Sequence, residues 1–359
     1  MNDDGLVLAG DVGGTNARFA LFSTAARGRQ LHHEVLDSRA STSFEDALDR
    51  FLAGAKNALG GVVRPRAASF GIAGPVVDQR VRTTNLPWTI DAGAVAKAFR
   101  IPRVTLLNDL VAAGLGAMAA PPSKLAVVHV GRPAKKGRNL AVIAAGTGLG
   151  EAAFVWDGAR HVPCATEGSH VEFAPRSGEE LELLVELAEE HGHVSYERVA
   201  SGSTLGMLYR FVVGRGKVRE PKTARARFEA AADPNRAVVE LAREGRSPGA
   251  RRALDLWCSV YGAEAGNLVL KTFATGGVFL CGGLSAALAD VLASGLGAAG
   301  RGKPAGRGKK ASSPFLEAFL DKGRMRPLVE ATPVAVCLEP LAGLRGAAAH
   351  AAGEAARAR

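Results

Sequence analysis

The chain of 359 residues contains few cysteines and no long hydrophobic run. Its four cysteines are scattered and form no Cys-x-x-Cys pair, which argues against a disulfide scaffold or a zinc ribbon and favours a reducing cytosol. No apolar stretch reaches the roughly 18 residues that a membrane-spanning helix needs, so no membrane partner is expected. The acidic segment MNDDGLVL lacks the pattern of a signal peptide, and we therefore expect a cytoplasmic protein.

Concentrated positive charge is also missing, although the net charge is +10. A nucleic-acid-binding protein usually gathers its basic residues on one element. Here they fall in three runs rich in glycine or proline, residues 131–138, 214–227 and 301–310, which we predict to be solvated loops. The last run belongs to a low-complexity segment, residues 295–313, for which we predict a mobile loop. No nucleic-acid partner is expected.

Two common signatures of nucleotide binding do not occur. The chain has no GxxxxGK[ST] loop, and it has no GxGxxG followed by the helix and acidic residue of a dinucleotide-binding fold. If the chain binds a nucleotide, glycine hairpins must hold the phosphates.

The pattern of hydrophobic residues predicts an α/β protein of two domains, since a chain of this length can bury two cores. Strands alternate with amphipathic helices in the first part, where one helix begins after Ser43 as its cap. Residues 179–294 are mostly helical, and an alanine-rich helix follows the last strand. The two series each contain a glycine-rich turn, which suggests duplicated half-domains. The predicted strands lie in residues 4–22 (two strands), 31–41, 67–76 and 103–109, and then in residues 125–130, 139–156, 276–283 and 333–339.

A glycine turn joins two strand-like runs in the segment LVLAGDVGGTNARFALF, residues 6–22. Backbone N–H groups in such a turn are unscreened by side chains and can approach a phosphate closely. Asp11 is placed to hold Mg²⁺, directly or through water, and Arg18 to complete charge neutralisation. Taken alone, the segment is better interpreted as a plain hairpin with an incidental aspartate. The residues expected at the phosphates are Gly10, Asp11, Val12, Gly13, Gly14, Thr15, Asn16 and Arg18.

Two other glycine turns favour the phosphate interpretation. AAGTGLGEA places Gly146, Thr147 and Gly148 after a strand, in a pattern suited to the β/γ end of a nucleotide. FLCGGLS ends a strand with Gly282 and Gly283, where the sugar or base of a nucleotide can lie close to the backbone.

Polar residues at two further sites suit a ligand with hydroxyl groups. Asp109 follows a strand and begins a helix, whose N-terminus favours a charged carboxylate able to accept a hydroxyl proton. Asn108 both donates and accepts, although the two residues are equally consistent with a simple helix cap. In EGSHVEF, Glu167 and His170 suit neighbouring hydroxyls. Metal binding there is the competing interpretation, but the spacing matches no standard zinc pattern.

Six motifs, in this order, resemble the bacterial ATP-dependent glucokinase family: GDVGGTNARFALF, LLNDLVAAGLG, GTGLGEA, EGSHVEFAPR, HVSYERVASG and GGVFLCGG. That family belongs to the sugar kinase/actin/heat-shock ATPase superfamily, and the resemblance extends from about residue 5 to about residue 350. It implies an α/β, two-domain ribonuclease H-like fold with a cleft between domains. The implied small domain is residues 1–109 plus 342–359, and the large domain, with helical insertions, is residues 110–341.

The resemblance also implies the reaction and the roles of residues. ATP would phosphorylate the 6-hydroxyl of glucose with Mg²⁺, in a homodimer, and Asp109 would be the catalytic base. The implied sugar ligands are Asn85, Asn108, Asp109, Glu167, His170 and Glu197. A neighbouring family carries a cysteine-rich zinc motif after the equivalent histidine, whereas this chain continues VEFAPRSG, so no structural zinc is expected. Ser169 replaces the second glycine of the usual EGGH motif.

Three alternatives remain from the sequence. The substrate is another hexose, such as fructose, mannose or glucosamine; or the chain is a sugar-responsive transcription regulator; or it is an actin-like filament or chaperone ATPase. The regulator would carry a DNA-binding module ahead of a first strand that begins here near residue 6. The actin-like ATPase would have no use for Glu167, His170 and Glu197.

Overall fold

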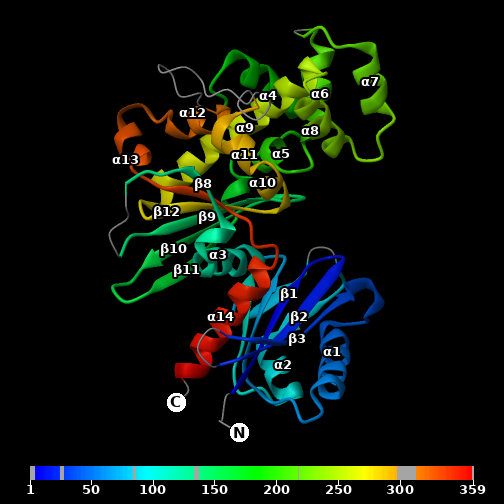
Figure 1. Cartoon of the computed structure of the whole chain (residues 1–359), viewed down its shortest axis with the longest axis vertical. Coiled ribbons are helices and arrows are strands. Elements are labelled where there is room, and N and C mark those ends of the chain that lie inside the picture. Colours follow the sequence, from blue (N-terminus) through cyan, green and yellow to red (C-terminus); the bar gives the residue numbers. More distant parts are fainter. Residues whose placement is uncertain are drawn as a thin grey trace. The chain divides into compact units, whose positions relative to one another are not determined.

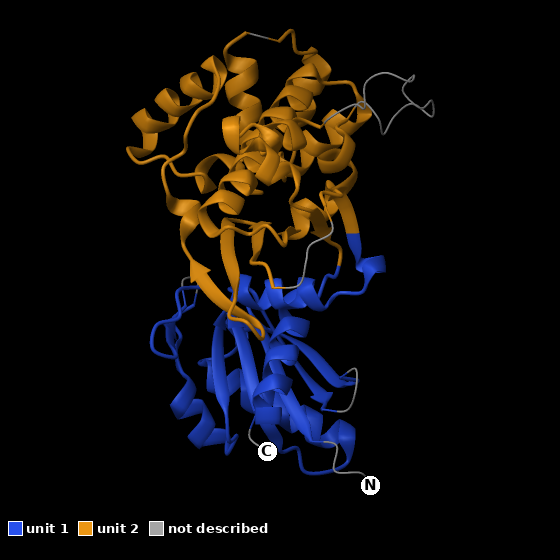
Figure 2. Cartoon of the chain, turned by 90° about the vertical axis from the view of Figure 1, so that its left-hand side faces the viewer, with its two compact units in different colours: residues 1–125, 339–359 blue, residues 126–338 orange. Residues whose placement is uncertain are grey.

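The computed structural model describes residues 5–24, 28–83, 86–132, 137–216, 218–296 and 313–357. The chain divides into two compact units, coloured separately in Figure 2. Unit 1 comprises residues 1–125 and 339–359, and unit 2 comprises residues 126–338. The domain boundaries expected from the sequence, at residues 109 and 342, stay a prediction.

Unit 1 is built on a five-stranded sheet in the order β3-β2-β1-β4-β7 (Figure 1). The first three strands are antiparallel neighbours, whereas β4 and β7 continue the sheet parallel to β1. The hairpin predicted over residues 4–22 is therefore confirmed. The strand bounds are β1 Leu6–Val12, β2 Asn16–Ser23, β3 Gln30–Asp37, β4 Pro65–Ile72 and β7 Val104–Asn108, with a separate pair β5 Arg80–Arg82 and β6 Thr89–Asp91.

Successive side chains of each strand point to opposite faces of the sheet, and helices cover both faces. Leu8 points into a core with α1 (Phe44–Leu59) and α2 (Ala92–Phe99), where Phe19, Phe44, Phe51 and Phe70 contact one another. The expected cap of α1 is confirmed, since Ser43 Oγ accepts a hydrogen bond from the backbone N–H of Asp46 at 3.1 Å.

On the other face, Val7 and Ala9 pack against the alanine-rich helix α14 (Ala342–Arg357). Helix α14 also packs closely on α3 (Asp109–Ala119). A side chain at Gly116 would collide with the backbone of Ala342, so this close packing requires glycine there.

Unit 2 contains a six-stranded sheet in the order β11-β10-β9-β12-β13-β8. Five of its strands repeat the arrangement of unit 1. Strands β11, β10 and β9 form an antiparallel meander, and β12 and β13 continue the sheet parallel to β9. The expectation of duplicated half-domains is confirmed at the level of strand order. The bounds are β8 Leu125–His129, β9 Leu140–Ala145, β10 Leu149–Trp156, β11 His161–Thr166, β12 Gly277–Cys281 and β13 Val334–Cys337.

Helix α9, Pro248–Thr272, is the centre of unit 2 and is apolar on most of its surface, as expected of a buried helix. The indole N–H of Trp257 donates to the Ser201 carbonyl at 2.9 Å, and Tyr261 donates to the Ile143 carbonyl at 3.2 Å. The remaining helices are α4 Gly178–His191, α5 Glu197–Ala200, α6 Leu205–Gly214, α7 Lys222–Glu229, α8 Pro234–Glu244, α10 Gly283–Ala287, α11 Ala289–Ser294, α12 Pro314–Leu320 and α13 Arg326–Glu330.

The prediction of a loop over residues 214–227 is wrong for its second half, which forms α7. Phe228 is buried, and Arg227 forms ion pairs with Glu240 and Glu244 of α8. Tertiary packing therefore stabilises a basic segment that composition assigns to a loop. The basic run at 301–310 and most of the predicted mobile loop lie outside the described residues.

Across the described ranges, no helix combines the length and the apolar character needed to cross a membrane.

Candidate active site

The glycine turn of residues 13–15 connects β1 to β2 at one edge of the unit 1 sheet. The backbone N–H of Gly13 donates to the Asn16 carbonyl at 3.0 Å and closes the turn. Ser38, which is fully buried, holds the turn through two hydrogen bonds. Its hydroxyl donates to the Gly13 carbonyl at 2.9 Å, and its N–H donates to the Thr15 carbonyl at 2.9 Å. Sequence analysis did not identify Ser38, because it lies beyond the next strand.

Asp11 and Arg18 face each other across the hairpin. They are paired in the strand register, with Arg18 Nη1 3.5 Å from Asp11 Oδ2. Burial raises the pKa of Asp11, and the positive charge of Arg18 opposes that rise. Gly343, in the first turn of α14, leaves room for the carboxylate, since a β-carbon there would lie 3.1 Å from Asp11 Cγ. Asp11 is therefore a half-buried carboxylate with one weak cationic partner.

Asp109 lies at the same edge of this sheet, since β1, β4 and β7 are parallel and their carboxyl ends coincide. Asn108 caps α3, with its Oδ1 accepting from the N–H groups of Leu110 and Val111, and Asp109 is the first residue of the helix. Asp109 Oδ1 also accepts from the Leu110 N–H at 2.9 Å. Unit 1 thus brings Asp11, the glycine turn and Asp109 to one edge.

The second glycine turn, residues 146–148, connects β9 to β10 in unit 2 and is held from two directions. The backbone N–H of Gly202 donates to the Gly146 carbonyl at 2.8 Å, and Ser203 Oγ donates to the Thr147 carbonyl at 2.8 Å. Sequence analysis assigned no role to either residue. A β-carbon at Gly202 would lie 2.5 Å from the Gly146 oxygen, so this close approach requires glycine.

Leu149, the residue after this turn, is hydrogen-bonded to the predicted sugar ligand Glu197. The Oε2 atom of Glu197 accepts from the Leu149 N–H at 3.0 Å. Glu197 is near His170 because residues 171–173 and 194–196 lie side by side: the N–H of Phe173 donates to the Val194 carbonyl, and the N–H of Tyr196 donates to the Val171 carbonyl.

Glu167, His170 and Glu197 form one cluster, as the sugar interpretation requires. His170 Nε2 lies 3.9 Å from Glu167 Oε2, and His170 Nδ1 lies 4.0 Å from Glu197 Oε1. The side chains of Glu167 and His170 are more than half exposed, whereas that of Glu197 is 32% exposed. Ser169, the departure from the family motif, is buried within this turn. Three polar side chains in unit 2 are therefore open to a ligand.

A cavity of about 490 Å³ begins at this cluster. His170, Glu197 and Thr147 line it, together with Ser203 and residues of α4 to α6. Its wall combines the second glycine turn with two of the predicted sugar ligands.

The third glycine turn, residues 282–283, follows β12 and lies beside the end of β9, because Cys281 pairs with Ala144 in the parallel ladder. Gly282 has a positive φ of 90°, and a β-carbon there would lie 2.4 Å from the Ala145 carbonyl oxygen. Gly283 faces open space, with no heavy atom within 4 Å of its ideal β-carbon position. Unit 2 therefore brings its two predicted nucleotide turns to one sheet edge.

Asn85, a predicted sugar ligand, lies outside the described residues. Within the parts of the chain that are described, no three His, Cys, Asp or Glu side chains group as ligands of one metal ion.

The geometry can be compared with known proteins. The family model described as glucokinase matches residues 8–300 and 307–354. The glucokinase of Nostoc punctiforme is 34% identical over 362 residues, which cover 97% of this chain and 99% of that protein. A crystal structure of glucokinase from an Antarctic psychrotroph has a TM-score of 0.79 and 27% identity, and the alignment covers 97% of this chain and 99% of that one.

A ROK family glucokinase from Streptomyces griseus, solved in complex with glucose and AMPPNP, is similar in fold, with a TM-score of 0.59 and 22% identity. That alignment covers 97% of this chain and 99% of the other. The repeated sheets, their glycine turns and these similarities define a sugar kinase of the actin-like ATPase fold, as the sequence predicted. Within that class, this chain belongs to the glucokinase family of ATP-dependent sugar kinases.

Proposed function

We propose that the chain transfers the γ-phosphoryl group of ATP to the 6-hydroxyl of D-glucose, giving glucose 6-phosphate and ADP. One observation carries this proposal: the hydrogen bond from Leu149 to Glu197 joins a glycine turn of the phosphate-binding kind to a cluster of polar side chains suited to a polyol. Membership in the glucokinase family supports the same reaction.

Asp109 is the proposed general base. A sugar hydroxyl is a weak nucleophile, and a positioned carboxylate that accepts its proton accelerates such a step by about a hundredfold to ten-thousandfold. As the bond from the hydroxyl oxygen to the γ-phosphorus forms, the bond from that phosphorus to the ADP oxygen breaks. The proton passes to Asp109, whose carboxylate is oriented by the Leu110 N–H and stabilised by the N-terminus of α3.

The proposed sugar ligands divide by chemistry. Glu167 and Glu197 are acceptors for pairs of hydroxyl groups, and His170 donates from one ring nitrogen and accepts at the other when it is neutral. Asn108 retains one amide donor beyond its cap, because its Nδ2 is 3.3 Å from the Gly74 carbonyl and its Oδ1 is used by α3. Asn85 completes the proposed set.

ATP would be held by the backbone of the three glycine turns. The N–H groups of residues 14–16 and 147–148 suit the phosphates, whereas those of Gly13 and Gly146 close the two turns. Gly10, Val12 and Arg18 flank the first turn, and Gly282 and Gly283 suit the sugar or base. Mg²⁺ is usually bound through one or two carboxylates together with phosphate oxygens, and the half-buried carboxylate of Asp11 fits that donor set. Asp11 would hold the ion, which neutralises phosphate charge when bound.

A homodimer in the cytoplasm is also part of the proposal. The four cysteines are all free thiols, and three of them are buried, which suits a reducing compartment. Sedimentation of the purified chain at several concentrations measures the oligomeric state, and a monomer at every concentration would contradict the dimer.

A donor-by-acceptor activity matrix tests the function. ATP, ADP and polyphosphate are each combined with glucose, fructose, mannose and glucosamine in the presence of Mg²⁺. We expect ATP with glucose to give the highest kcat/KM. A higher value for another hexose would reassign the substrate, and turnover with ADP or polyphosphate but not ATP would reassign the donor.

A further inference from the structure

Two buried carboxyl groups lie behind the turn that carries Glu167 and His170. Glu151 comes from β10 and is 1% exposed, and Glu264 comes from α9 and is 0% exposed. Both carboxyl groups lie beside the same ammonium group, that of Lys271. Buried carboxylates are costly unless they are paired or protonated, so each oxygen needs a partner.

Within the described part of the chain, Glu264 has hydrogen-bond partners for both of its carboxyl oxygens, whereas Glu151 has none for either. Glu264 Oε1 accepts from Lys271 Nζ at 2.5 Å, and its Oε2 accepts from Asn267 Nδ2 at 2.9 Å. Among the described residues, neither oxygen of Glu151 accepts a hydrogen bond, and Lys271 Nζ lies 3.9 Å from its Oε2. One ammonium group thus faces two carboxyl groups.

A single proton resolves this arrangement. Two ionised carboxylates cannot donate to each other, whereas a protonated Glu151 donates its O–H to Glu264. Burial, followed by the negative charge of Glu264, raises the pKa of Glu151 to about 8, and Lys271 opposes that rise. Glu151 therefore holds the proton of the pair at neutral pH.

Glu151 also touches the sugar-ligand turn directly. A β-carbon on Gly168, the residue between Glu167 and Ser169, would lie 2.5 Å from Glu151 Oε2, so the carboxyl group contacts the backbone of the turn. The turn is fixed on its other side by the Gly168 N–H, which donates to Thr166 Oγ1 at 2.9 Å. Ionisation of Glu151 would place a second negative charge beside Glu264, against this backbone.

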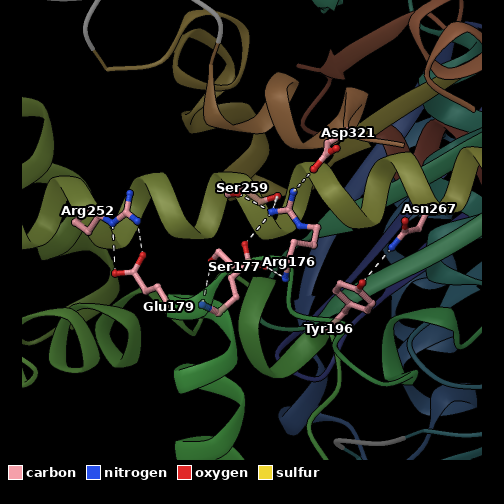
Figure 3. A network of polar contacts seen from close by, with 9 residues as sticks. Arg176, Ser177, Glu179, Tyr196, Arg252, Ser259, Asn267 and Asp321 are labelled. Atoms are coloured by element: carbon pink, nitrogen blue, oxygen red, sulfur yellow. Dashed lines mark hydrogen bonds and ion pairs between the residues drawn. The ribbon is translucent and has the colours of Figure 1, made fainter. Parts of the chain in front are cut away.

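The pair reaches the second sugar-ligand segment as well. Asn267 Nδ2, which donates to Glu264, also lies 3.0 Å from the hydroxyl of Tyr196, the residue before Glu197 (Figure 3). The carboxyl pair therefore contacts both segments that carry the cluster, one at Gly168 and the other through Asn267 and Tyr196.

Other charged and titratable groups near the pair come from several segments. Tyr261 of α9 donates to the carbonyl of Ile143, which pairs with Glu151 in the sheet, and burial raises the pKa of Tyr261 well above its usual value. Lys322 packs against α9 at Gly266, and Arg176 donates to Ser259 of α9; burial lowers the pKa of Lys322 to about 8. The exposed groups of the turn are Glu167 and His170, and Glu197 bonds the N–H of Leu149, two residues before Glu151.

We propose that Glu151 is a positioning residue: in its protonated form it donates to Glu264 and holds the turn of residues 167–170 in the arrangement that binds sugar. The inference rests on the proposed role of Glu167 and His170 as sugar ligands. It adds a residue that does not touch the sugar, and it makes sugar affinity dependent on pH.

The test compares the wild-type chain with E151Q, whose amide keeps the shape and a donor for Glu264 but does not ionise. KM for glucose, KM for ATP and kcat are measured from about pH 6 to about pH 9.5. If only the protonated form binds sugar, the wild-type KM for glucose rises about tenfold between pH 7 and pH 9. We expect KM for ATP to stay level and E151Q to keep a low, flat KM for glucose. An alkaline rise that persists in E151Q overturns the inference, as does a flat profile in the wild type.

E264Q is the second variant, in case E151Q does not fold. It removes the negative charge that an ionised Glu151 would repel and frees Lys271 to pair with Glu151, so the alkaline rise in KM for glucose should disappear. An unchanged profile in E264Q overturns the inference.

A direct measurement separates this inference from the proposed function. The side-chain carboxyl carbon of Glu151 is followed by ¹³C NMR in the wild-type chain and assigned by its loss in E151Q. A midpoint near 8 supports the shared proton, and an ordinary glutamate midpoint overturns it even if the chain phosphorylates glucose. If glucose is not phosphorylated at any pH while the midpoint is near 8, the proposed function fails and the carboxyl pair stands.

Discussion

Glu197 accepts a hydrogen bond from the backbone N–H of Leu149 at 3.0 Å, and this contact links two predicted sites that lie about fifty residues apart in the sequence. The glycine turn ending at Gly148 and the sugar-ligand cluster therefore share one side chain. A change at Glu197 should affect the sugar and the nucleotide differently, depending on which of the two roles it removes.

Replacing Glu197 with glutamine keeps an oxygen acceptor for Leu149 but removes the negative charge offered to the sugar. We expect E197Q to raise KM for glucose about tenfold or more and to leave KM for ATP nearly unchanged, since a charged hydrogen bond is worth about 1.5–3 kcal/mol. E197A, which loses both contacts, should raise both constants. Steady-state kinetics distinguish the variants, and equal effects of E197Q on both substrates would contradict the assignment.

Replacing Asp109 tests the proposed base. D109A should lower kcat by at least about a hundredfold while glucose still binds, because it removes proton transfer and leaves the other sugar ligands in place. D109N is the matched control for shape, since its amide oxygen still accepts from the Leu110 N–H. Rates from a coupled assay and glucose binding by calorimetry are the measurements. A near-normal kcat in D109N would remove Asp109 from the role of base.

Adding a methyl group at Gly202 tests the support of the second glycine turn. The new β-carbon would lie 2.5 Å from the Gly146 oxygen, so G202A should displace the turn, raise KM for ATP and destabilise unit 2 by about 1–3 kcal/mol. Gly214 is the control, because a β-carbon there meets no heavy atom within 4 Å. Kinetics and chemical denaturation of both variants decide the point: equal effects would show that the contact does not matter.

Ser38 provides a parallel test in unit 1. S38A removes the hydroxyl that donates to the Gly13 carbonyl, at a cost of about 1 kcal/mol, and should loosen the first turn and raise KM for ATP. Ser41 is a nearby serine that instead accepts from Arg50, so S41A serves as the control. If both variants change KM for ATP equally, the bond to Gly13 has no special role.

Glu151 should also make stability depend on pH. Burial and then the charge of Glu264 raise its pKa from the ordinary 4.5 to about 8 in the folded chain. Between these values the folded chain holds a proton that the unfolded chain has lost, so the free energy of unfolding falls as pH rises through this interval. In E151Q this contribution to the slope disappears. Denaturation curves of both proteins at several pH values measure the difference, and parallel slopes would contradict it.

Local sequence patterns predicted the unit 1 hairpin and the Ser43 cap because both depend on residues close together in the chain. Glu197 was added to Glu167 and His170 only through the family resemblance. Its members meet because residues 171–173 pair with residues 194–196, a short contact that no periodicity marks.

No local sequence pattern predicted the contact of Glu151 with Glu264 or the helix α7. Glu151 follows a glycine turn, and Glu264 lies within an apolar helix 113 positions later, so only the packing of α9 against the sheet brings them together. The loop predicted over residues 214–227 failed for the same reason. Burial of Phe228 and the ion pairs of Arg227 with α8 stabilise α7 against its composition.

The most direct test of the account is the identity of the product. The purified chain is incubated with ATP, Mg²⁺ and glucose, and the reaction is followed by ³¹P NMR. We predict one glucose 6-phosphate for each ADP formed, and no release of inorganic phosphate beyond the enzyme-free control. Release of inorganic phosphate without a phosphorylated sugar would identify an ATPase and contradict the account.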